Sequence, residues 1–322
     1  MCGIAGFVND MPIDVKCPVL QRMTDMIAHR GPDSEGHYID EHAALGHRRL
    51  SIIDLGGGQQ PIYNEDGSKV ITFNGEIYNY QTLREELIAA GHTFTTKSDT
   101  EVLLHGYEQW GVDLLQRVRG MFTFVIWDKN KQELFGARDH FGIKPFYYAK
   151  MNGTFMYASE IKSLLRHPDF VKELNAEALK PYMTFQYPAI GETFFKGVYK
   201  LPEGHYFTYR DGKMDIHRYY DEDFREGKQK LGELVNSIDQ TVCDSVKAHQ
   251  IADVEVGSFL SSGVDSSYVA AVARPQHTYS IGFGKGTYNE SQQAGELAEL
   301  LKLNNTAESL TDEEAFAAFP RI

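Results

Sequence analysis

A cysteine stands second in the chain, in the opening segment MCGIAGF. Removal of Met1 would make Cys2 the N-terminal residue and place a free α-amine beside its thiol. An α-amino group titrates at about pH 7.7–8, so part of it is uncharged at neutral pH and can take the thiol proton. Cys2 is therefore a candidate nucleophile whose base is its own amine. The same segment is also typical of a buried first β-strand, in which Cys2 would be only a small apolar residue.

The dipeptide Asn74–Gly75, in the segment FNGEIYN, offers what an amide-cleaving thiol requires. A tetrahedral intermediate needs an oxyanion hole, which one side-chain amide and one backbone N–H can form. Asn74 supplies the amide, and Gly75 allows a close approach to the backbone. The alternative is an ordinary short turn after the strand KVITF, since Asn-Gly is a common turn signal.

Three charged residues match the charges of a free amino acid. Arg49 could bind a carboxylate through two hydrogen bonds, while Glu76 and Asp99 could bind an ammonium group. Each also has a simpler interpretation: Arg49 as a surface charge on a strand, Glu76 as an acid in a turn, and Asp99 as a helix N-cap. The segments on which they stand must therefore be considered together.

Short strands and hairpins dominate the chain from Met1 to about Tyr220, which predicts an α+β domain with large antiparallel sheets. The predicted strands are ALGHRRLSII, KVITFNGEIY, MFTFVIWD, ELFGARD and FYYAKMNGTFMYAS. Two helices are predicted among them, one over Tyr80–Ala90 and one that begins at Ser98–Asp99. The charged stretch 221–230 is predicted to be a linker.

After the linker the pattern changes to alternating helices and strands, which predicts a parallel, right-handed α/β sheet from Leu231 onward. The segment SSGVDSS, Ser261–Ser267, stands between a strand (VEVGSFL) and a helix (SSYVAAVA), where backbone N–H groups at a helix N-terminus face an anion. It lacks the GxxxxGK[ST] pattern of a Walker A loop. A plain Ser/Gly turn that caps a helix is the alternative.

The composition limits the classes of function. The 322 residues suffice for two domains, and no apolar run approaches the length of a membrane span. Three cysteines without a CxxC pair indicate neither a disulfide framework nor a zinc ribbon, so we expect a reduced, cytoplasmic protein. The net charge of −13 argues against a nucleic-acid or anionic-membrane surface. His29, His47 and His105 lie beside apolar segments and are interpreted as packing or capping groups.

The segments of the first domain, taken in order, resemble the glutaminase domain of the class II amidotransferases. The matching segments are MCGIAGF, RGPDSEG, RLSIIDL, FNGEIYN, SDTE and ARDHFGIKPFYY. The resemblance implies a four-layer αββα fold of the N-terminal-nucleophile type. It also implies that Cys2 attacks the side-chain amide of glutamine while Asn74 and Gly75 form the oxyanion hole. The implied glutamine-binding residues are Arg49, Leu50, Ser51, Ile52, Ile53, Asn74, Gly75, Glu76 and Asp99.

The loop of the second domain resembles the pyrophosphate loop of the ATP pyrophosphatases, with Ser262 where the pattern SGGxDS has its first Gly. A class II glutaminase followed by such a loop is similar to the glutamine-hydrolysing asparagine synthetases. In that family aspartate is activated by ATP with release of pyrophosphate, and ammonia then displaces AMP. The implied ATP-binding residues are Leu260, Ser261, Ser262, Gly263, Asp265, Ser266 and Ile281, with Asp265 as the Mg²⁺ ligand.

This resemblance predicts a glutaminase domain over residues 1–220, a linker over 221–230 and an incomplete synthetase domain over 231–322. A downstream motif of the SGEGSDE type and the aspartate-binding region are absent, so we expect this chain to retain only the glutaminase half. Glutamine and aspartate are the expected small-molecule partners, and a homodimer stays open. Two alternatives remain: another amidotransferase–ATP pyrophosphatase fusion, similar to β-lactam synthetase, and a truncated fragment with a regulatory or interaction role.

Overall fold

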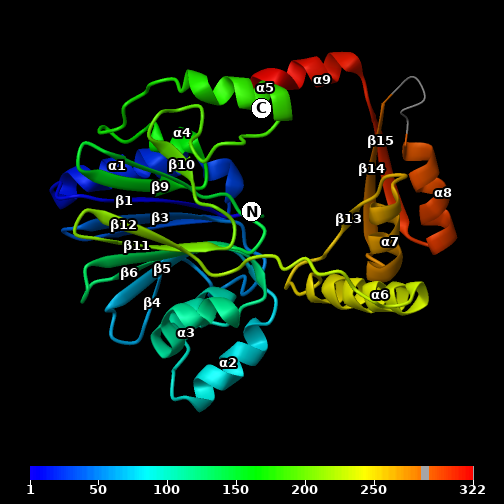
Figure 1. Cartoon of the computed structure of the whole chain (residues 1–322), viewed down its shortest axis with the longest axis horizontal. Coiled ribbons are helices and arrows are strands. Elements are labelled where there is room, and N and C mark those ends of the chain that lie inside the picture. The colour runs from blue at the N-terminus through cyan, green and yellow to red at the C-terminus, as the bar shows by residue number, and fades with distance from the viewer. Residues whose placement is uncertain (284–289, 322) are drawn as a thin grey trace. The chain divides into compact units, whose positions relative to one another are not determined.

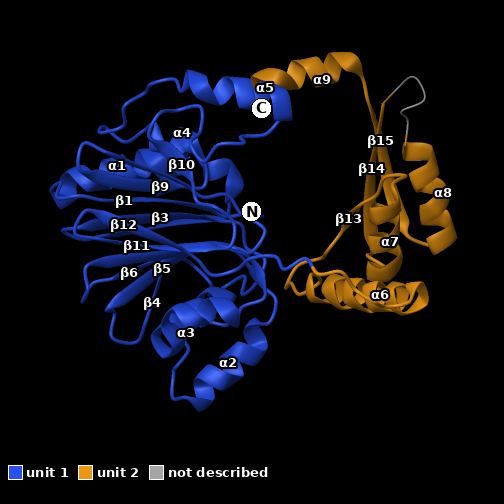
Figure 2. Cartoon of the chain, viewed as in Figure 1, with its two compact units in different colours: residues 1–224 blue, residues 225–322 orange. Residues whose placement is uncertain are grey.

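The computed structural model describes residues 1–283 and 290–321 and divides the chain into two compact units (Figure 2). Unit 1 comprises residues 1–224 and unit 2 comprises residues 225–322. Figure 1 shows sheets stacked between helices in unit 1 and helices packed beside a small sheet in unit 2. Each unit is described by itself.

Unit 1 is built on two antiparallel sheets. The first contains, in spatial order, β10 (Val198–Lys200), β8 (Tyr147–Met151), β9 (Thr154–Ala158), β1 (Gly3–Val8), β3 (Ala43–Arg49) and β2 (Ser34–Ile39). The second contains β12 (Lys213–Arg218), β11 (His205–Arg210), β7 (Glu133–Arg138), β6 (Gly120–Asp128), β5 (Lys69–Ile77) and β4 (Ile62–Tyr63). All the strands predicted in this domain are therefore confirmed, although several are shorter than predicted.

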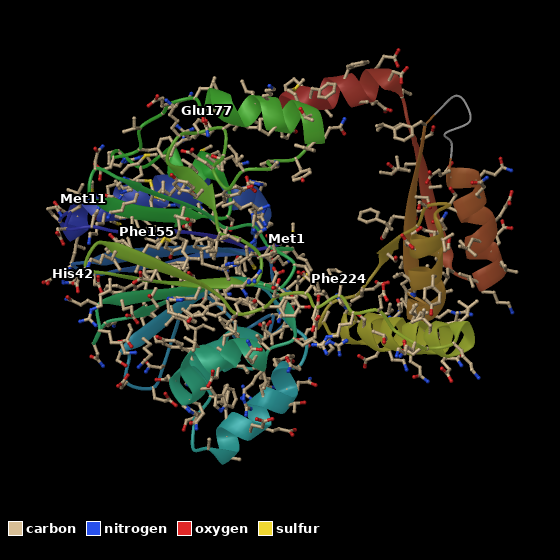
Figure 3. All side chains as sticks on the ribbon, in the orientation of Figure 1. Met1, Met11, His42, Phe155, Glu177 and Phe224 are labelled. Atoms are coloured by element: carbon tan, nitrogen blue, oxygen red, sulfur yellow. The ribbon has the colours of Figure 1, made fainter. Side chains whose placement is uncertain are left out.

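Helices cover the outer face of each sheet, and one core cluster lies between the sheets while a second joins α1 to the first sheet. Helix α1 (Ile13–Asp25) packs on the first sheet, and α3 (Asp99–Trp110), with α2 (Tyr80–Ala89) beside it, packs on the second. Buried aromatic side chains such as Trp127, Phe146 and Phe155 fill the space between the sheets, where Figure 3 labels Phe155. The predicted four-layer αββα fold is confirmed.

Helix α3 begins as its sequence predicts, because the Ser98 hydroxyl accepts a hydrogen bond from Thr100 N at 3.1 Å. The helix ends at Gly111, whose φ of +57° is a left-handed conformation that suits glycine. Both helices predicted in this domain are confirmed, and the structure adds others. Helix α1 carries Pro18 in its interior, which weakens its signal in the sequence, and α4 (Ile161–Leu164) and α5 (Leu179–Phe185) are too short to show a period. Short 3₁₀ turns occupy Ala28–Arg30, Gly111–Gln116 and Ala176–Ala178.

Unit 2 has the predicted alternating order and parallel pairing. Its elements are α6 (Leu231–Ala248), β13 (Ser258–Phe259), α7 (Val264–Ala273), β14 (His277–Phe283), α8 (Ser291–Leu301), β15 (Asn304–Leu310), α9 (Asp312–Ala318) and a 3₁₀ turn over Phe319–Arg321. The three strands lie in the order β13-β14-β15. The strand predicted over VEVGSFL is reduced to two residues because only Ser258 and Phe259 pair with β14. Among the described residues, no helix is both long and apolar enough to cross a membrane.

Candidate active site

Cys2 lies directly before β1, where pairing with β3 fixes the backbone that carries it. Gly3 stands opposite Arg48, and the Cys2 thiol meets the backbone of Leu50 just beyond β3. Leu50 N lies 3.4 Å from Cys2 Sγ and Leu50 O lies 3.6 Å from it. Arg30 Nε donates to the Cys2 carbonyl at 2.9 Å, which holds the residue from the other side. The candidate nucleophile is therefore fixed by strand pairing and by one buried cation.

A small pocket of about 30 Å³ opens beside this thiol. Its wall contains Cys2, Arg49, Leu50, Ile52, Ile53, Gly58, Gln60, Phe73, Gly75, Glu76, Ser98, Asp99 and Thr100. Most of the residues expected around glutamine thus come together from β3 and the loop after it, from β5 and from the start of α3. Ser51 and Asn74 do not line the pocket.

Asn74 and Gly75 lie within β5 and not in a turn, so the turn interpretation was wrong. Antiparallel pairing sets Asn74 opposite Thr123 and Gly75 opposite Phe122 on β6. A Cβ on Gly75 would stand 2.2 Å from the carbonyl oxygen of Met121, so only glycine fits here. Asn74 is 1% exposed, and neither its amide nitrogen nor its amide oxygen has a hydrogen-bond partner in the described chain. An unpartnered buried amide is costly, and an acceptor brought by a ligand would offset that cost.

Arg49 is buried beside the pocket and orders the loop that follows β3. Its Nη2 donates to Ile53 O at 3.0 Å and to Asp54 O at 2.7 Å. A Cβ on Gly58 would lie 2.7 Å from this nitrogen, so glycine lets the loop pass close to the guanidinium. Within the described residues, no hydrogen bond from Nε or Nη1 of Arg49 is found, which leaves them to bind an anion.

Glu76 and Asp99 bring two carboxyl groups to the same pocket. Asp99 Oδ2 accepts a hydrogen bond from Ile77 N at 3.0 Å, so the acid at the start of α3 is tied to the end of β5. Burial raises the pKa of Glu76, and the nearby Asp99 carboxylate raises it further. Burial also raises the pKa of Asp99. Both shifts express the cost of holding two negative charges in a small pocket, a cost that a bound ammonium group would offset.

The surroundings of the Cys2 thiol favour its neutral form. Burial raises the pKa of Cys2, the hydrogen bond from Leu50 N opposes this shift, and Glu76 and Asp99 add to it. The thiol is therefore protonated at neutral pH and needs a base before it can attack a carbonyl carbon. Burial lowers the pKa of the Met1 amine, which shows that an amine at this end of the chain is more readily deprotonated than one in water.

The pocket wall also contains five residues that were not among the predicted glutamine-binding residues, namely Gly58, Gln60, Phe73, Ser98 and Thr100. Gln60 links two walls, since its side chain accepts from Phe73 N at 2.6 Å and donates to Thr100 Oγ1 at 3.3 Å. The Gly-rich segment before Pro61 and the neighbours of Asp99 were the available signals. Neither signal says which residue of the segment reaches the pocket.

The loop Ser261–Ser266 of unit 2 joins β13 to α7, and Gly263 precedes the first turn of the helix. Ser261 and Ser266 contact each other through their hydroxyls at 2.7 Å, and Gly263 N donates to Ser261 Oγ at 3.2 Å. The Asp265 carboxylate is exposed in the first turn of α7, where a hard cation can reach it. The loop thus joins small hydroxyls, backbone N–H groups and one acid.

The two residues expected at the adenine differ in their surroundings. The Leu260 side chain is buried with Ala270, Ala294 and Ala298, so only its backbone can face a nucleotide. Ile281 is exposed, on the face of β14 that α7 and α8 leave uncovered.

Two stacked antiparallel sheets between helices, with a cysteine directly before the first strand, define the class of N-terminal-nucleophile glutamine amidotransferases. The chain belongs to the glutamine amidotransferase domain family, whose sequence model matches residues 1–220. The model of the asparagine synthase family matches residues 237–322.

Curated relatives extend the similarity over both units. Asparagine synthetase [glutamine-hydrolyzing] 1 of Bacillus subtilis is 43% identical over 330 residues, which cover 100% of this chain and 52% of that protein. Putative asparagine synthetase [glutamine-hydrolyzing] 2 of Methanocaldococcus jannaschii is 35% identical over 320 residues, which cover 90% of this chain and 61% of that protein. The chain therefore spans about half to three fifths of the length of these relatives.

A solved structure supports the fold. The B. subtilis glutamine phosphoribosylpyrophosphate amidotransferase, in complex with ADP and GMP, aligns with a TM-score of 0.51 at 16% identity. The alignment covers 95% of this chain and 65% of that chain. At this identity the likeness shows the fold alone.

Proposed function

We propose that this chain is the glutaminase part and the beginning of the synthetase part of a glutamine-dependent asparagine synthetase. The observation that carries the proposal is the position of the Cys2 thiol in a pocket with one guanidinium and two carboxyl groups. These groups are complementary to the carboxylate and ammonium of a free amino acid. The similarity to named glutamine-hydrolysing asparagine synthetases over the whole chain supports the same function.

The proposed reaction begins once Met1 has been removed. The α-amine of Cys2 takes the thiol proton, and Sγ attacks the side-chain carbonyl carbon of glutamine. Asn74 Nδ2 and the backbone N–H of Gly75 donate to the oxyanion that forms, which would give the unpartnered Asn74 amide an acceptor. The protonated amine returns its proton to the leaving nitrogen, and ammonia departs. Water then hydrolyses the γ-glutamyl thioester to glutamate and restores the thiol.

The proposed glutamine contacts divide by charge. Arg49 binds the α-carboxylate, Glu76 and Asp99 bind the α-ammonium, and the backbone of the segment 50–53 lines the side of the pocket. Binding of the ammonium group would favour ionisation of both acids, whose pKa values burial raises in the free chain.

For the second unit we propose ATP binding, with the domain limits expected from the sequence: glutaminase over 1–220, linker over 221–230 and a partial synthetase domain over 231–322. Ser261, Ser262, Gly263 and Ser266 would hold pyrophosphate, Asp265 would hold Mg²⁺, and Leu260 and Ile281 would flank the adenine. In the proposed overall reaction ATP adenylates the β-carboxylate of aspartate, and ammonia displaces AMP. We place this reaction in the reducing cytoplasm.

The test is glutamate release by the processed chain, with and without ATP and aspartate. We expect glutamate in both cases and no matching yield of asparagine. Cys2→Ala should abolish hydrolysis while glutamine still binds, as measured by calorimetry. Absence of glutamate from a sample shown by mass spectrometry to lack Met1, or unchanged turnover by the Cys2→Ala variant, would refute the proposal.

A further inference from the structure

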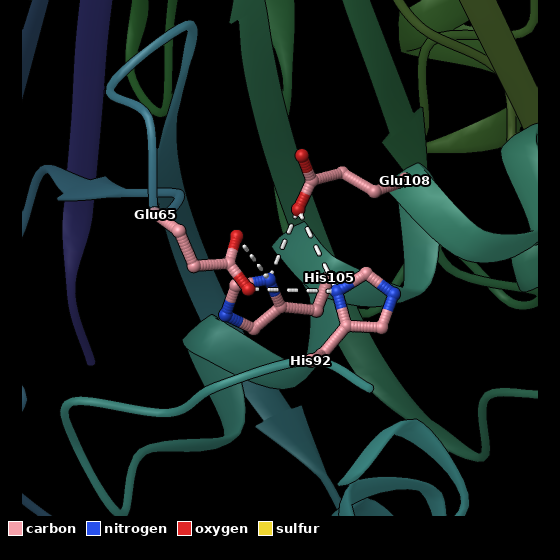
Figure 4. Close-up of side chains that lie close together, drawn as sticks. All are labelled: Glu65, His92, His105 and Glu108. Carbon is pink, nitrogen blue, oxygen red and sulfur yellow. Dashed lines mark hydrogen bonds and ion pairs between the residues drawn. The ribbon is translucent and has the colours of Figure 1, made fainter. Parts of the chain in front are cut away.

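Four side chains of unit 1 that do not line the pocket beside Cys2 converge on one point, as Figure 4 shows. Glu65 lies in the turn between β4 and β5, His92 lies in the loop between α2 and α3, and His105 and Glu108 lie one turn apart on α3. Each offers one ligand atom, and these atoms lie within 4.8 Å of one another. Three separate segments thus bring two imidazoles and two carboxylates to one point.

The spacing of the ligand atoms matches a small tetrahedral site. His105 Nδ1 lies 3.0 Å from Glu108 Oε2 and 3.6 Å from Glu65 Oε2. His92 Nδ1 lies 3.7 Å from Glu65 Oε1 and 4.0 Å from Glu108 Oε2. Ligands that bind one zinc ion tetrahedrally at about 2.0–2.1 Å stand roughly 3.3 Å from each other. Small side-chain rotations are therefore enough to coordinate one ion.

The outer nitrogens of the two histidines differ in their surroundings. His92 Nε2 lies 3.2 Å from Gln109 Oε1, whereas His105 Nε2 is 3.7 Å from Glu101 Oε1 and has no hydrogen-bond partner among the described residues. A hydrogen bond donated to Gln109 leaves Nδ1 of His92 unprotonated, as is usual for histidines that bind metals.

The carboxylates are held in the same way. Asn64 Nδ2 donates to Glu108 Oε1 at 2.7 Å and leaves Oε2 on the side of the cluster. Thr93 N donates to Glu65 Oε1 at 3.1 Å and draws the loop that carries His92 toward Glu65. The cluster thus has an outer shell of partners as well as four candidate ligands.

Carboxylates are in excess around the cluster. Those of Glu65, Glu101 and Glu108 lie 3.6, 3.7 and 3.0 Å from nitrogen atoms of the His105 ring. The ammonium of Lys69, 3.6 Å from Glu108 Oε1, adds one positive charge. A bound dication would offset the two negative charges that remain.

We propose that Glu65, His92, His105 and Glu108 form a binding site for one divalent transition-metal ion of the zinc type. Two imidazoles select against Mg²⁺ and Ca²⁺, which prefer oxygen ligands, and the absence of a thiol among the four distinguishes the site from a cysteine-rich zinc finger. A cavity of about 330 Å³ lined by Glu65, Glu101 and His105 gives the ion access from solvent.

The ion would be a structural clamp. It joins the β4–β5 turn, the loop 90–98 and the middle of α3, and that loop leads directly to Ser98 and Asp99 of the pocket. The proposal does not depend on glutamine hydrolysis, because none of the four candidate ligands lines the pocket. Two of them stand on α3, and only the first residues of that helix reach the pocket.

The experiment is calorimetric titration of the metal-stripped, untagged full chain with Zn²⁺. We expect one ion per chain, with affinity reduced at least about tenfold in His92→Ala and in Glu65→Gln, since even outer-shell changes cost about 10–100-fold. The control His42→Ala removes a histidine that also faces a carboxylate, 3.7 Å from Asp10, but lies elsewhere in unit 1. It should bind as the unchanged chain does. Circular dichroism would establish that each variant is folded.

Cobalt provides a second measurement. Co²⁺ bound by nitrogen and oxygen atoms should show tetrahedral d–d absorption without a thiolate charge-transfer band. Hydrogen exchange in residues 92–98 should slow when the ion is added to the unchanged chain and not in His92→Ala. A thiolate band, unchanged affinity in both variants, or no binding by the unchanged chain would each overturn the proposal.

Discussion

Replacement of Asn74 by alanine should separate activity from stability. Most buried side chains stabilise the fold, so their truncation costs about 2–5 kcal/mol. Asn74 differs, because its amide is 1% exposed and neither polar atom has a partner in the described chain. The folded protein therefore carries the desolvation cost of this amide, and only a reacting substrate would repay it.

The magnitudes follow from these two terms. Removing an unsatisfied buried polar group relieves about 1–3 kcal/mol, and this gain offsets much of the packing that the truncation loses. The free energy of unfolding of Asn74→Ala should thus stay within about 1 kcal/mol of the unchanged chain. Loss of one oxyanion-hole donor should lower kcat about 10²–10³-fold, which corresponds to about 2.7–4 kcal/mol of transition-state stabilisation.

Glutamate release gives kcat, and urea unfolding followed by tryptophan fluorescence gives stability. The matched control is Thr123→Val, because Thr123 stands opposite Asn74 on β6, is fully buried and also has an unpartnered side-chain oxygen. This control should keep its activity. Activity of Asn74→Ala within a few-fold of the unchanged chain would refute the oxyanion role. Destabilisation by more than about 2 kcal/mol would show that the amide has a partner in the folded protein.

Three further outcomes are expected. Gly75→Ala should lower the free energy of unfolding by about 1–3 kcal/mol, because the added Cβ would meet backbone atoms that cannot move away. Gly56→Ala is the control, since a Cβ there would have nothing within 4 Å. Equal urea midpoints for the two variants would contradict the prediction. For Glu160, burial would raise the pKa, but hydrogen bonds from Lys162, Arg30 and His29 outweigh it and lower the pKa to about 2, below the ordinary 4.5. The stabilising effect of ionised Glu160 is complete above pH 4.5 and is lost as the pH falls toward 2. Glu160→Gln should therefore lose less stability over this range than the unchanged chain. Urea midpoints that fall in parallel for the two proteins would argue against the pairing of Glu160 with these three cations. Glutamine added to Cys2→Ala should slow hydrogen exchange mainly in the loop 50–58 and little in residues 73–77 of β5. The reverse pattern would show that the loop is not the part of the pocket that adjusts to glutamine.

The sequence predicts those parts of the site that depend on local signals. Ser98 is an N-cap and Asp99 opens α3 because both follow from the residues of one helix turn. The dipeptide Asn74–Gly75 is different, since its local pattern favours a turn. Its place inside β5 comes from pairing with β6, a strand more than forty residues later in the sequence. Pairing over such a distance leaves no mark on the dipeptide itself.

Residues brought to the site by loops are the hardest to predict. Gln60 and Gly58 reach the pocket because the Arg49 guanidinium orders the loop that precedes them, and no periodic pattern encodes that contact. His105 shows the same limit. Its place on an apolar helix face suggests packing, and only the folded chain shows that Glu65 and His92, from two other segments, face it.

The two walls of the pocket are held by different kinds of bonds, and this difference determines which wall can move. Asn74, Gly75 and Glu76 lie on β5, which is paired along its length with β6. The facing loop 50–58 has no strand partner and depends on side chains: Arg49 holds two of its carbonyls, and Asp54 Oδ2 accepts from Lys97 N at 2.8 Å. A substrate carboxylate that binds Arg49 would act on the same guanidinium that orders this loop. Because the proposed oxyanion-hole residues Asn74 and Gly75 belong to the sheet, we expect the loop to adjust around glutamine while the oxyanion hole keeps its geometry.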